Sequence, residues 1–238
     1  MSTHAAGPDV RGRPSAAAGL STHWTWLAGG FVLAFAVPFV FADILGVQRD
    51  VFYGLYALAV LGLFALWSRS TGYDLVAACR RRWGLALGLG LAAAAVMVAV
   101  VLRTEDATAR PDGLELLAAV VWRGVVYGVT DGLLLSVFPI LVVFAALAGS
   151  RLDRGLTGKV AIGAVALVAS LSMTAVYHAG YSDFRSDKVG KPLTGDLVWS
   201  VPTLVTLNPI GAPIAHAGLH TSAVLHSYET DVFLPPHE

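Results

Sequence analysis

Long apolar runs separated by short polar segments dominate the sequence. A run of about 20 apolar residues is long enough to cross a bilayer as a helix. The pattern therefore predicts an all-α fold, a polytopic transmembrane helical bundle with six to eight membrane segments. The predicted segments are 26–45, 51–67, 84–102, 116–148, 160–177, 196–207 and 209–225, with an interfacial helix over 68–83.

The run 116–148 is too long for one ordinary span and too short for two full ones. It is interpreted either as one tilted, kinked helix or as a broken pair. Basic residues favour the cytoplasmic side. Placing both Arg80–Arg82 and the loop at Arg151 there requires 116–148 to cross the membrane once, and we prefer that interpretation.

Three regions follow from this pattern. Residues 1–22 are polar and rich in Ala, Gly, Ser and Pro, which predicts a disordered N-terminal tail. Residues 23–228 form the predicted transmembrane helical domain, and 229–238 a C-terminal tail.

Composition supports the membrane assignment. Hydrophobic residues make up 56% of the 238 residues and charged residues only 13%, where a soluble domain carries about 25% charged residues. The formal net charge of zero gives no footprint for a nucleic acid. One cysteine, Cys79, excludes disulfide frameworks and cysteine-based zinc sites. We expect a multi-pass protein of the bacterial cytoplasmic membrane, a source suggested by the abundance of Ala, Gly, Val and Arg.

The most informative residues are His216 and His220 in the last apolar segment. Their i, i+4 spacing places both imidazoles on one helix face. Ionisable groups inside membrane segments are costly, so they indicate a functional site by default. Two imidazoles so spaced are a common pair of ligands for zinc or another first-row metal. The alternative is a pair of hydrogen-bonded packing histidines.

Two further polar positions accompany them. Arg123, Tyr127 and Asp131 share a helix face at i, i+4 and i+8. His178 stands where a predicted span ends. Asp131 and His178 are candidate additional metal ligands, but each of these residues also has a structural interpretation: Arg123 as a packing partner, Asp131 as a cap at a helix break, and His178 as an interfacial polar residue.

The order Trp122-Arg-Gly124, then His178, then His216 with His220 resembles the CPBP family of intramembrane proteins, the CAAX prenyl proteases and bacteriocin-processing proteins. Their pattern is E-E-x-x-x-[FWY]-R-G, then F-x-x-x-H, then H-x-x-x-N or H-x-x-x-D. The resemblance covers about residues 114–226.

The match departs from that pattern at several positions. Ala118 and Ala119 replace the paired glutamates, the first of which is thought to activate water in the family. Thr174 replaces an aromatic residue, and His220 replaces the asparagine. The resemblance therefore implies the family's architecture with a rewired or degenerate site.

Three functions remain open from the sequence. The first is a metal-dependent or His/Asp-based intramembrane hydrolase, peptidase-like, in whose metal-dependent form His178, His216, His220 and Asp131 bind zinc or another divalent transition metal. In it Asp131 or His178 would transfer protons and Arg123 would stabilise negative charge. The second is a non-catalytic membrane protein that binds a small ligand, lipid or protein partner. The third is a transporter or proton relay. Expected partners are membrane lipids and a membrane-embedded substrate.

Overall fold

The computed structural model describes residues 19–185, 187–229 and 233–235. Within these residues the secondary structure is entirely helical. Five helices are long and apolar enough to cross a membrane: Leu20–Ile44, Arg49–Thr71, Trp83–Thr104, Gly113–Leu147 and Leu156–Ala179. The protein is therefore a multi-pass membrane protein, and the all-α prediction is confirmed. Six to eight membrane segments were predicted, but among the described residues these five helices are the candidate spans.

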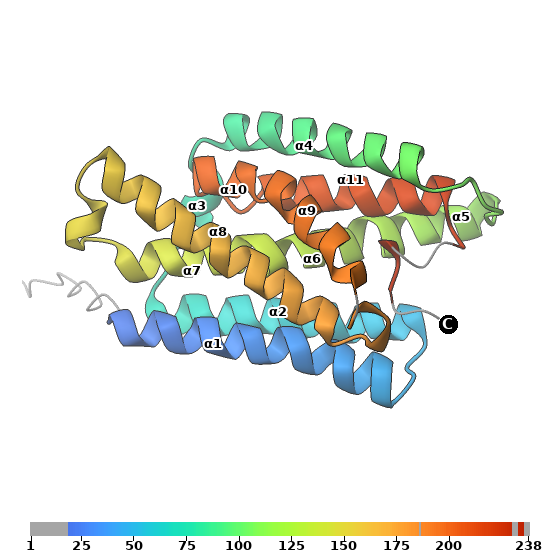
Figure 1. Ribbon diagram of the computed structural model, residues 1–238, viewed down its shortest axis with the longest axis horizontal. Coiled ribbons are helices and arrows are strands. Elements are labelled where there is room, and N and C mark those ends of the chain that lie inside the picture. The colour runs from blue at the N-terminus through green and yellow to red at the C-terminus, as the bar shows by residue number, and fades with distance from the viewer. Residues whose placement is uncertain (1–18, 186, 230–232, 236–238) are drawn as a thin grey trace, which may run out of the picture.

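The helices are arranged as a bundle of roughly aligned rods crossed by α8 (Figure 1). Their bounds, in chain order, are α1 (Leu20–Val37), α2 (Arg49–Thr71), α3 (Leu75–Arg80), α4 (Trp83–Thr104), α5 (Gly113–Ala119), α6 (Tyr127–Gly132), α7 (Phe138–Leu147), α8 (Leu156–Ala179), α9 (Gly190–Trp199), α10 (Val201–Thr206) and α11 (Gly211–His226). The 3-10 turns are η4 (Arg151–Asp153), η5 (Ser182–Phe184) and η6 (Asp187–Val189).

The long run predicted at 116–148 is one continuous helix over Gly113–Leu147. Two π-helical segments, η2 (Val120–Val126) and η3 (Leu133–Val137), interrupt its α-helical geometry on either side of α6. A third π-helical segment, η1 (Pro38–Ile44), continues α1. The single helix agrees with the interpretation that this run crosses once. Such widened turns are frequent at functional sites because they re-aim side chains.

Some predicted boundaries differ from the structure. The first helix begins at Leu20, inside the predicted tail 1–22, of which residues 1–18 lie outside the described residues. The interfacial helix expected over 68–83 is shorter, because α2 continues to Thr71 and ends at Gly72, whose φ of 70° is left-handed. In the predicted C-terminal tail, residues 230–232 and 236–238 lie outside the description, but Leu234 is buried against α5 and α11.

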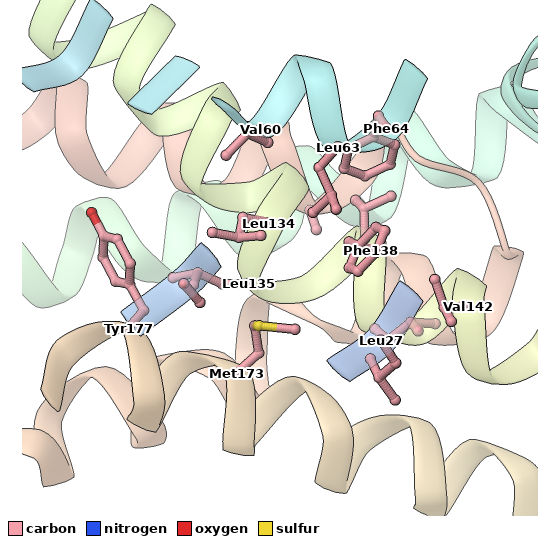
Figure 2. Close-up of a cluster of buried hydrophobic side chains, with 14 of the residues drawn as sticks. Leu27, Val60, Leu63, Phe64, Leu134, Leu135, Phe138, Val142, Met173 and Tyr177 are labelled. Carbon is pink, nitrogen blue, oxygen red and sulfur yellow. The ribbon is translucent and has the colours of Figure 1, made fainter. Parts of the chain in front are cut away.

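The main hydrophobic core lies between α1, α2, α7 and α8 (Figure 2). Phe138 is at its centre, where its ring meets Phe64 at 5.5 Å and Trp67 at 5.7 Å between ring centroids. Met173 enters from α8 and Leu27 from α1 (Figure 2). Because lipid tails are as apolar as these side chains, dispersion contacts and shape complementarity hold this core together.

A ridge of glycines brings the central helix against α11. Gly124, Gly128 and Gly132 recur every four residues, so they lie on one helix face. A Cβ added to Gly128 would lie 2.8 Å from the Cα of Ala217, and one on Gly132 would lie 2.7 Å from the Cα of Pro213. The two backbones therefore touch along this glycine ridge, as small residues allow in membrane helix pairs.

The glycine ridge yields a stability prediction. Gly128→Ala should destabilise the protein by about 1–3 kcal/mol, because the new methyl group meets backbone that cannot move aside. Gly88→Ala on α4 is the matched control, since a Cβ there meets nothing within 4 Å. The control should gain up to about 1 kcal/mol from helix propensity. Unfolding in mixed micelles measures the free energy of unfolding of both variants. Equal stability of Gly128→Ala and Gly88→Ala would refute the close approach of the central helix to α11.

Candidate metal centre

The glycine ridge positions a buried carboxylate beside two histidines. Asp131 follows Gly128 on α6, and His216 and His220 lie one turn apart on α11. Asp131 Oδ2 lies 3.4 Å from His220 Nε2 and 3.9 Å from His216 Nδ1. One ligand atom of each residue lies within 4.8 Å of the other two. The side chains are 5%, 1% and 4% exposed for Asp131, His216 and His220.

The hydrogen bonds of His220 determine its tautomer. Its Nδ1 lies 2.6 Å from the carbonyl oxygen of Phe233, and a carbonyl can only accept. Nδ1 therefore carries a hydrogen, and in the neutral ring Nε2 presents a lone pair to Asp131 Oδ2. A histidine whose second ring N–H donates to a backbone carbonyl is typical of metal ligands, because this bond fixes the ring orientation.

His216 is the third residue of this cluster, and its ring is buried. Neither of its ring nitrogens has a hydrogen-bond partner among the described residues, although both are buried. The indole ring of Trp199 packs against the imidazole at 4.2 Å between centroids. A buried polar group without a partner costs free energy. His216, the lone pair of His220 and the Asp131 carboxylate together form a set of possible metal ligands. A bound cation would give each of these groups a partner.

The other carboxylate oxygen of Asp131 is already fixed. Tyr56 donates its hydroxyl to Asp131 Oδ1 at 2.9 Å. Tyr56 belongs to a buried group of aromatic rings in which Tyr127 Oη lies 3.0 Å from Tyr177 Oη, and Tyr177 Oη 2.8 Å from Tyr181 Oη. The bond from Tyr56 holds Oδ1 of Asp131 and leaves Oδ2 facing the histidines. Outer-shell hydrogen bonds orient the carboxylate ligands of metal sites in the same way.

His178 lies near this centre but outside the group of three ligands. The backbone carbonyl of Thr174 accepts a hydrogen from its Nδ1 at 2.8 Å. The neutral ring therefore keeps its lone pair on Nε2. His178 lines the same cavity as Asp131, His216 and His220. The structure brings all four predicted ligands to one cavity, with three of them within mutual reach of a single ion.

The cavity has a volume of about 370 Å³. Its walls are largely apolar and include Met97, Val100, Val198 and Leu219 from α4, α9 and α11. Two of its lining residues on α4, Val96 and Val100, are 49% and 37% exposed, so the cavity has a partly open wall along α4. An apolar cavity with a few convergent polar groups is the usual form of a small-molecule or substrate site.

Arg123 lies elsewhere. Its Nε and Nη2 donate to the two carboxylate oxygens of Asp50, each at 2.8 Å. Its guanidinium also packs over the ring of Tyr228 at 5.2 Å. Arg123 does not line the cavity. This arrangement ties α2 to the central helix and corresponds to the structural interpretation of Arg123 given above.

The alanines in place of the paired glutamates also lie away from the cavity. Ala118 is exposed, and Ala119 packs with Ala223, Val224 and Leu234. Cys79 is likewise outside the cavity lining, and burial raises the pKa of its thiol, which disfavours the reactive thiolate. Neither the alanines nor Cys79 therefore contributes to the cavity, whose ionisable lining includes Asp131, His178, His216, His220 and Lys191.

Sequence reasoning did not find Tyr56, Trp199 and Phe233, which support the centre. Tyr56 is 75 residues from Asp131, and Trp199 and Phe233 lie on other elements than His216 and His220, so only the fold brings them together. The recurrence of Gly124, Gly128 and Gly132 was the one signal that could have indicated which helix faces α11.

No known protein-family model matches the chain, and it has no significant match among curated proteins or solved structures. The resemblance to the CPBP family therefore rests on the short motifs alone.

The bond between Arg123 and Asp50 gives a second prediction. A double-mutant cycle of Arg123→Ala and Asp50→Ala should show a coupling of about 1 kcal/mol, because the pair is bidentate and half-buried. Unfolding in mixed micelles measures it. Additive effects of the two substitutions would contradict the pairing.

Proposed function

We propose that this protein is a metal-dependent intramembrane hydrolase. One observation carries the proposal: Asp131, His216 and His220 converge within 4.8 Å in the wall of a largely apolar cavity. Catalytic zinc sites combine three protein ligands with one open position. A carboxylate and two imidazoles fit that ligand set, and the cavity adjoins the remaining position.

The donor chemistry suits zinc or a related first-row ion. Imidazole nitrogens and a carboxylate oxygen are ligands for zinc, iron and nickel, whereas calcium and magnesium favour oxygen-only sites. His220 is oriented by Phe233, and the second oxygen of Asp131 by Tyr56. A bound ion of this kind would supply Lewis acidity to a carbonyl and activate water.

His178 supplies the proton-transfer group. Its Nε2 carries the lone pair because Nδ1 is bonded to the carbonyl of Thr174. A histidine near neutral pH is suited to take a proton from attacking water and return it to the leaving group. In this proposal Asp131 is a ligand, and Arg123 stabilises the bundle through Asp50.

The substrate is a membrane-embedded amide or ester. The apolar walls, including Val96, Met97 and Val198, favour an apolar chain, and exposure of Val96 and Val100 on α4 offers entry from the lipid. The match of Arg123-Gly124, His178 and His216 to the CPBP motifs supports the same class. Asp131, two turns beyond Arg123, would supply the carboxylate that Ala118 and Ala119 lack.

Metal content is the first test of the proposal. Purified wild-type protein should contain one equivalent of zinc or another transition metal per chain, measured by inductively coupled plasma mass spectrometry. His220→Ala should lose it by about 10-fold or more, because a ligand is removed. His226→Ala is the control, since His226 lies on the same helix but bonds the carbonyl of Glu105. A folded wild type that binds no added zinc would refute the metal centre.

Hydrolysis assays distinguish a proton-transfer role of His178 from a role as a metal ligand. Proteoliposomes would be assayed with p-nitrophenyl acyl esters and a quenched hydrophobic peptide. His178→Ala should keep its metal but lower hydrolysis by about 10²–10⁴-fold. Metal-loaded wild type with no turnover of either probe would favour ligand binding over hydrolysis, and loss of metal in His178→Ala would make His178 a ligand instead.

A further inference from the structure

A second buried polar cluster lies behind the wall of the cavity, centred on Asp196 of α9. The carboxylate is fully buried, at 0% exposure. Hydroxyl groups surround it from η3, from α8 and from the junction of α9 with α10. These are the hydroxyls of Ser136, Ser170, Thr174 and Ser200, here called the hydroxyl cage.

Each hydroxyl of the cage contacts the carboxylate. Thr174 Oγ1 lies 3.0 Å from Oδ2, and Ser170 Oγ lies 3.1 Å from both Oδ1 and Oδ2. Ser136 Oγ lies 3.3 Å from Oδ1, and Ser200 Oγ makes a short contact with the same oxygen. The described hydrogen-bond partners of Asp196 are therefore neutral hydroxyls.

The cage oxygens also contact one another. Ser200 Oγ lies 2.8 Å from Ser170 Oγ and 3.0 Å from Ser136 Oγ. Ser170 Oγ lies 2.8 Å from the carbonyl oxygen of Leu135. Oxygens from separate helices thus crowd one small volume at the level of Ser170.

Hydrogens are too few for these contacts. A serine or threonine hydroxyl carries one hydrogen, and carboxylate and carbonyl oxygens carry none. The cage makes eight oxygen–oxygen contacts, the one to Leu135 included, with four hydroxyl hydrogens to share among them. Protonation of Asp196 would add one hydrogen to the whole cage and still leave lone pairs facing lone pairs. A cation among the oxygens satisfies all of them together.

We propose that Asp196 and its hydroxyl cage bind a monovalent cation of the sodium type. Carboxylate, hydroxyl and carbonyl oxygens are the ligands that hard cations prefer. The single charge of Asp196 is balanced by one positive charge, whereas a divalent ion would leave excess charge in an apolar interior. Oxygen separations near 3 Å form a small cage, which favours sodium over potassium.

The cage is separate from the histidine centre but shares structural elements with it. Gly195 and Trp199, on either side of Asp196 in α9, line the cavity, and Trp199 packs on His216. Thr174 supplies one cage hydroxyl and the carbonyl that holds His178. Bound sodium therefore fixes the position of α9 as a wall of the cavity. The inference does not depend on the hydrolase proposal.

The test measures sodium binding directly. Detergent-purified protein would be titrated with radioactive sodium (²²Na⁺) in a scintillation proximity assay, with choline chloride keeping the ionic strength constant. Wild type should bind sodium saturably, about one ion per chain. Unlabelled sodium should displace the tracer at lower concentrations than potassium or calcium. The thermal midpoint should rise with sodium, because a ligand of the native state stabilises it.

Variants locate the ion. Ser170→Ala should weaken sodium binding by about tenfold or more, since a liganding oxygen is removed. Asp196→Asn should abolish it. Ser222→Ala is the matched control, a buried serine on α11 whose hydroxyl bonds the carbonyl of Leu219 within its own helix.

Two outcomes would overturn the proposal. One is a folded wild type with neither saturable ²²Na⁺ binding nor sodium-dependent stability, which would make Asp196 a protonated packing group. The other is unchanged binding in Ser170→Ala. Because the wild-type titration and Ser170→Ala each decide the question, failure of Asp196→Asn to fold leaves the test intact.

Discussion

The close approach of the central helix and α11 is the constraint on which the rest of the structure depends. Gly124, Gly128 and Gly132 place backbone against backbone, with no space for a Cβ between them. At that separation Asp131, on α6 between two π-helical segments, comes within 3.4 Å of His220. A helix pair held apart by larger side chains would leave these ionisable groups too distant to share an ion, and each would then be a buried polar group without compensation.

The polar interior follows one rule at two places. At the histidine centre, the lone pair of His220 faces a carboxylate and the ring nitrogens of His216 have no hydrogen-bond partner among the described residues. At Asp196 the oxygen–oxygen contacts outnumber the hydroxyl hydrogens. Nitrogen and oxygen ligands at the first place suit a transition metal, whereas oxygen alone at the second suits a hard monovalent ion. The helix α9 links the two, because it carries Asp196 and also places Trp199 on His216. A cation at each place, as proposed above, would satisfy both clusters inside an apolar bundle.

Local patterns in the sequence predicted the long helices and the side chains that share a helix face, because both depend on residues close together in the chain. The apolar runs 84–102 and 160–177 correspond to α4 over Trp83–Thr104 and α8 over Leu156–Ala179, because burial in lipid requires an unbroken apolar helix. The spacing of His216 and His220 predicted a shared face. Long-range partners were not predictable in this way: Asp50 is 73 residues from Arg123. The hydroxyl cage was also missed, because single serines in apolar helices are common and only the fold brings η3, α8 and the end of α9 together.

The central claim is that Asp131, His216 and His220 hold one transition metal ion. Anomalous diffraction from crystals grown with zinc, with data collected above and below the zinc absorption edge, tests it most directly. The account predicts a single strong anomalous peak between Asp131 Oδ2, a ring nitrogen of His216 and His220 Nε2, at about 2.0–2.2 Å from each ligand atom. A peak confined to the protein surface, or a zinc-soaked crystal with no peak at this position, would contradict it.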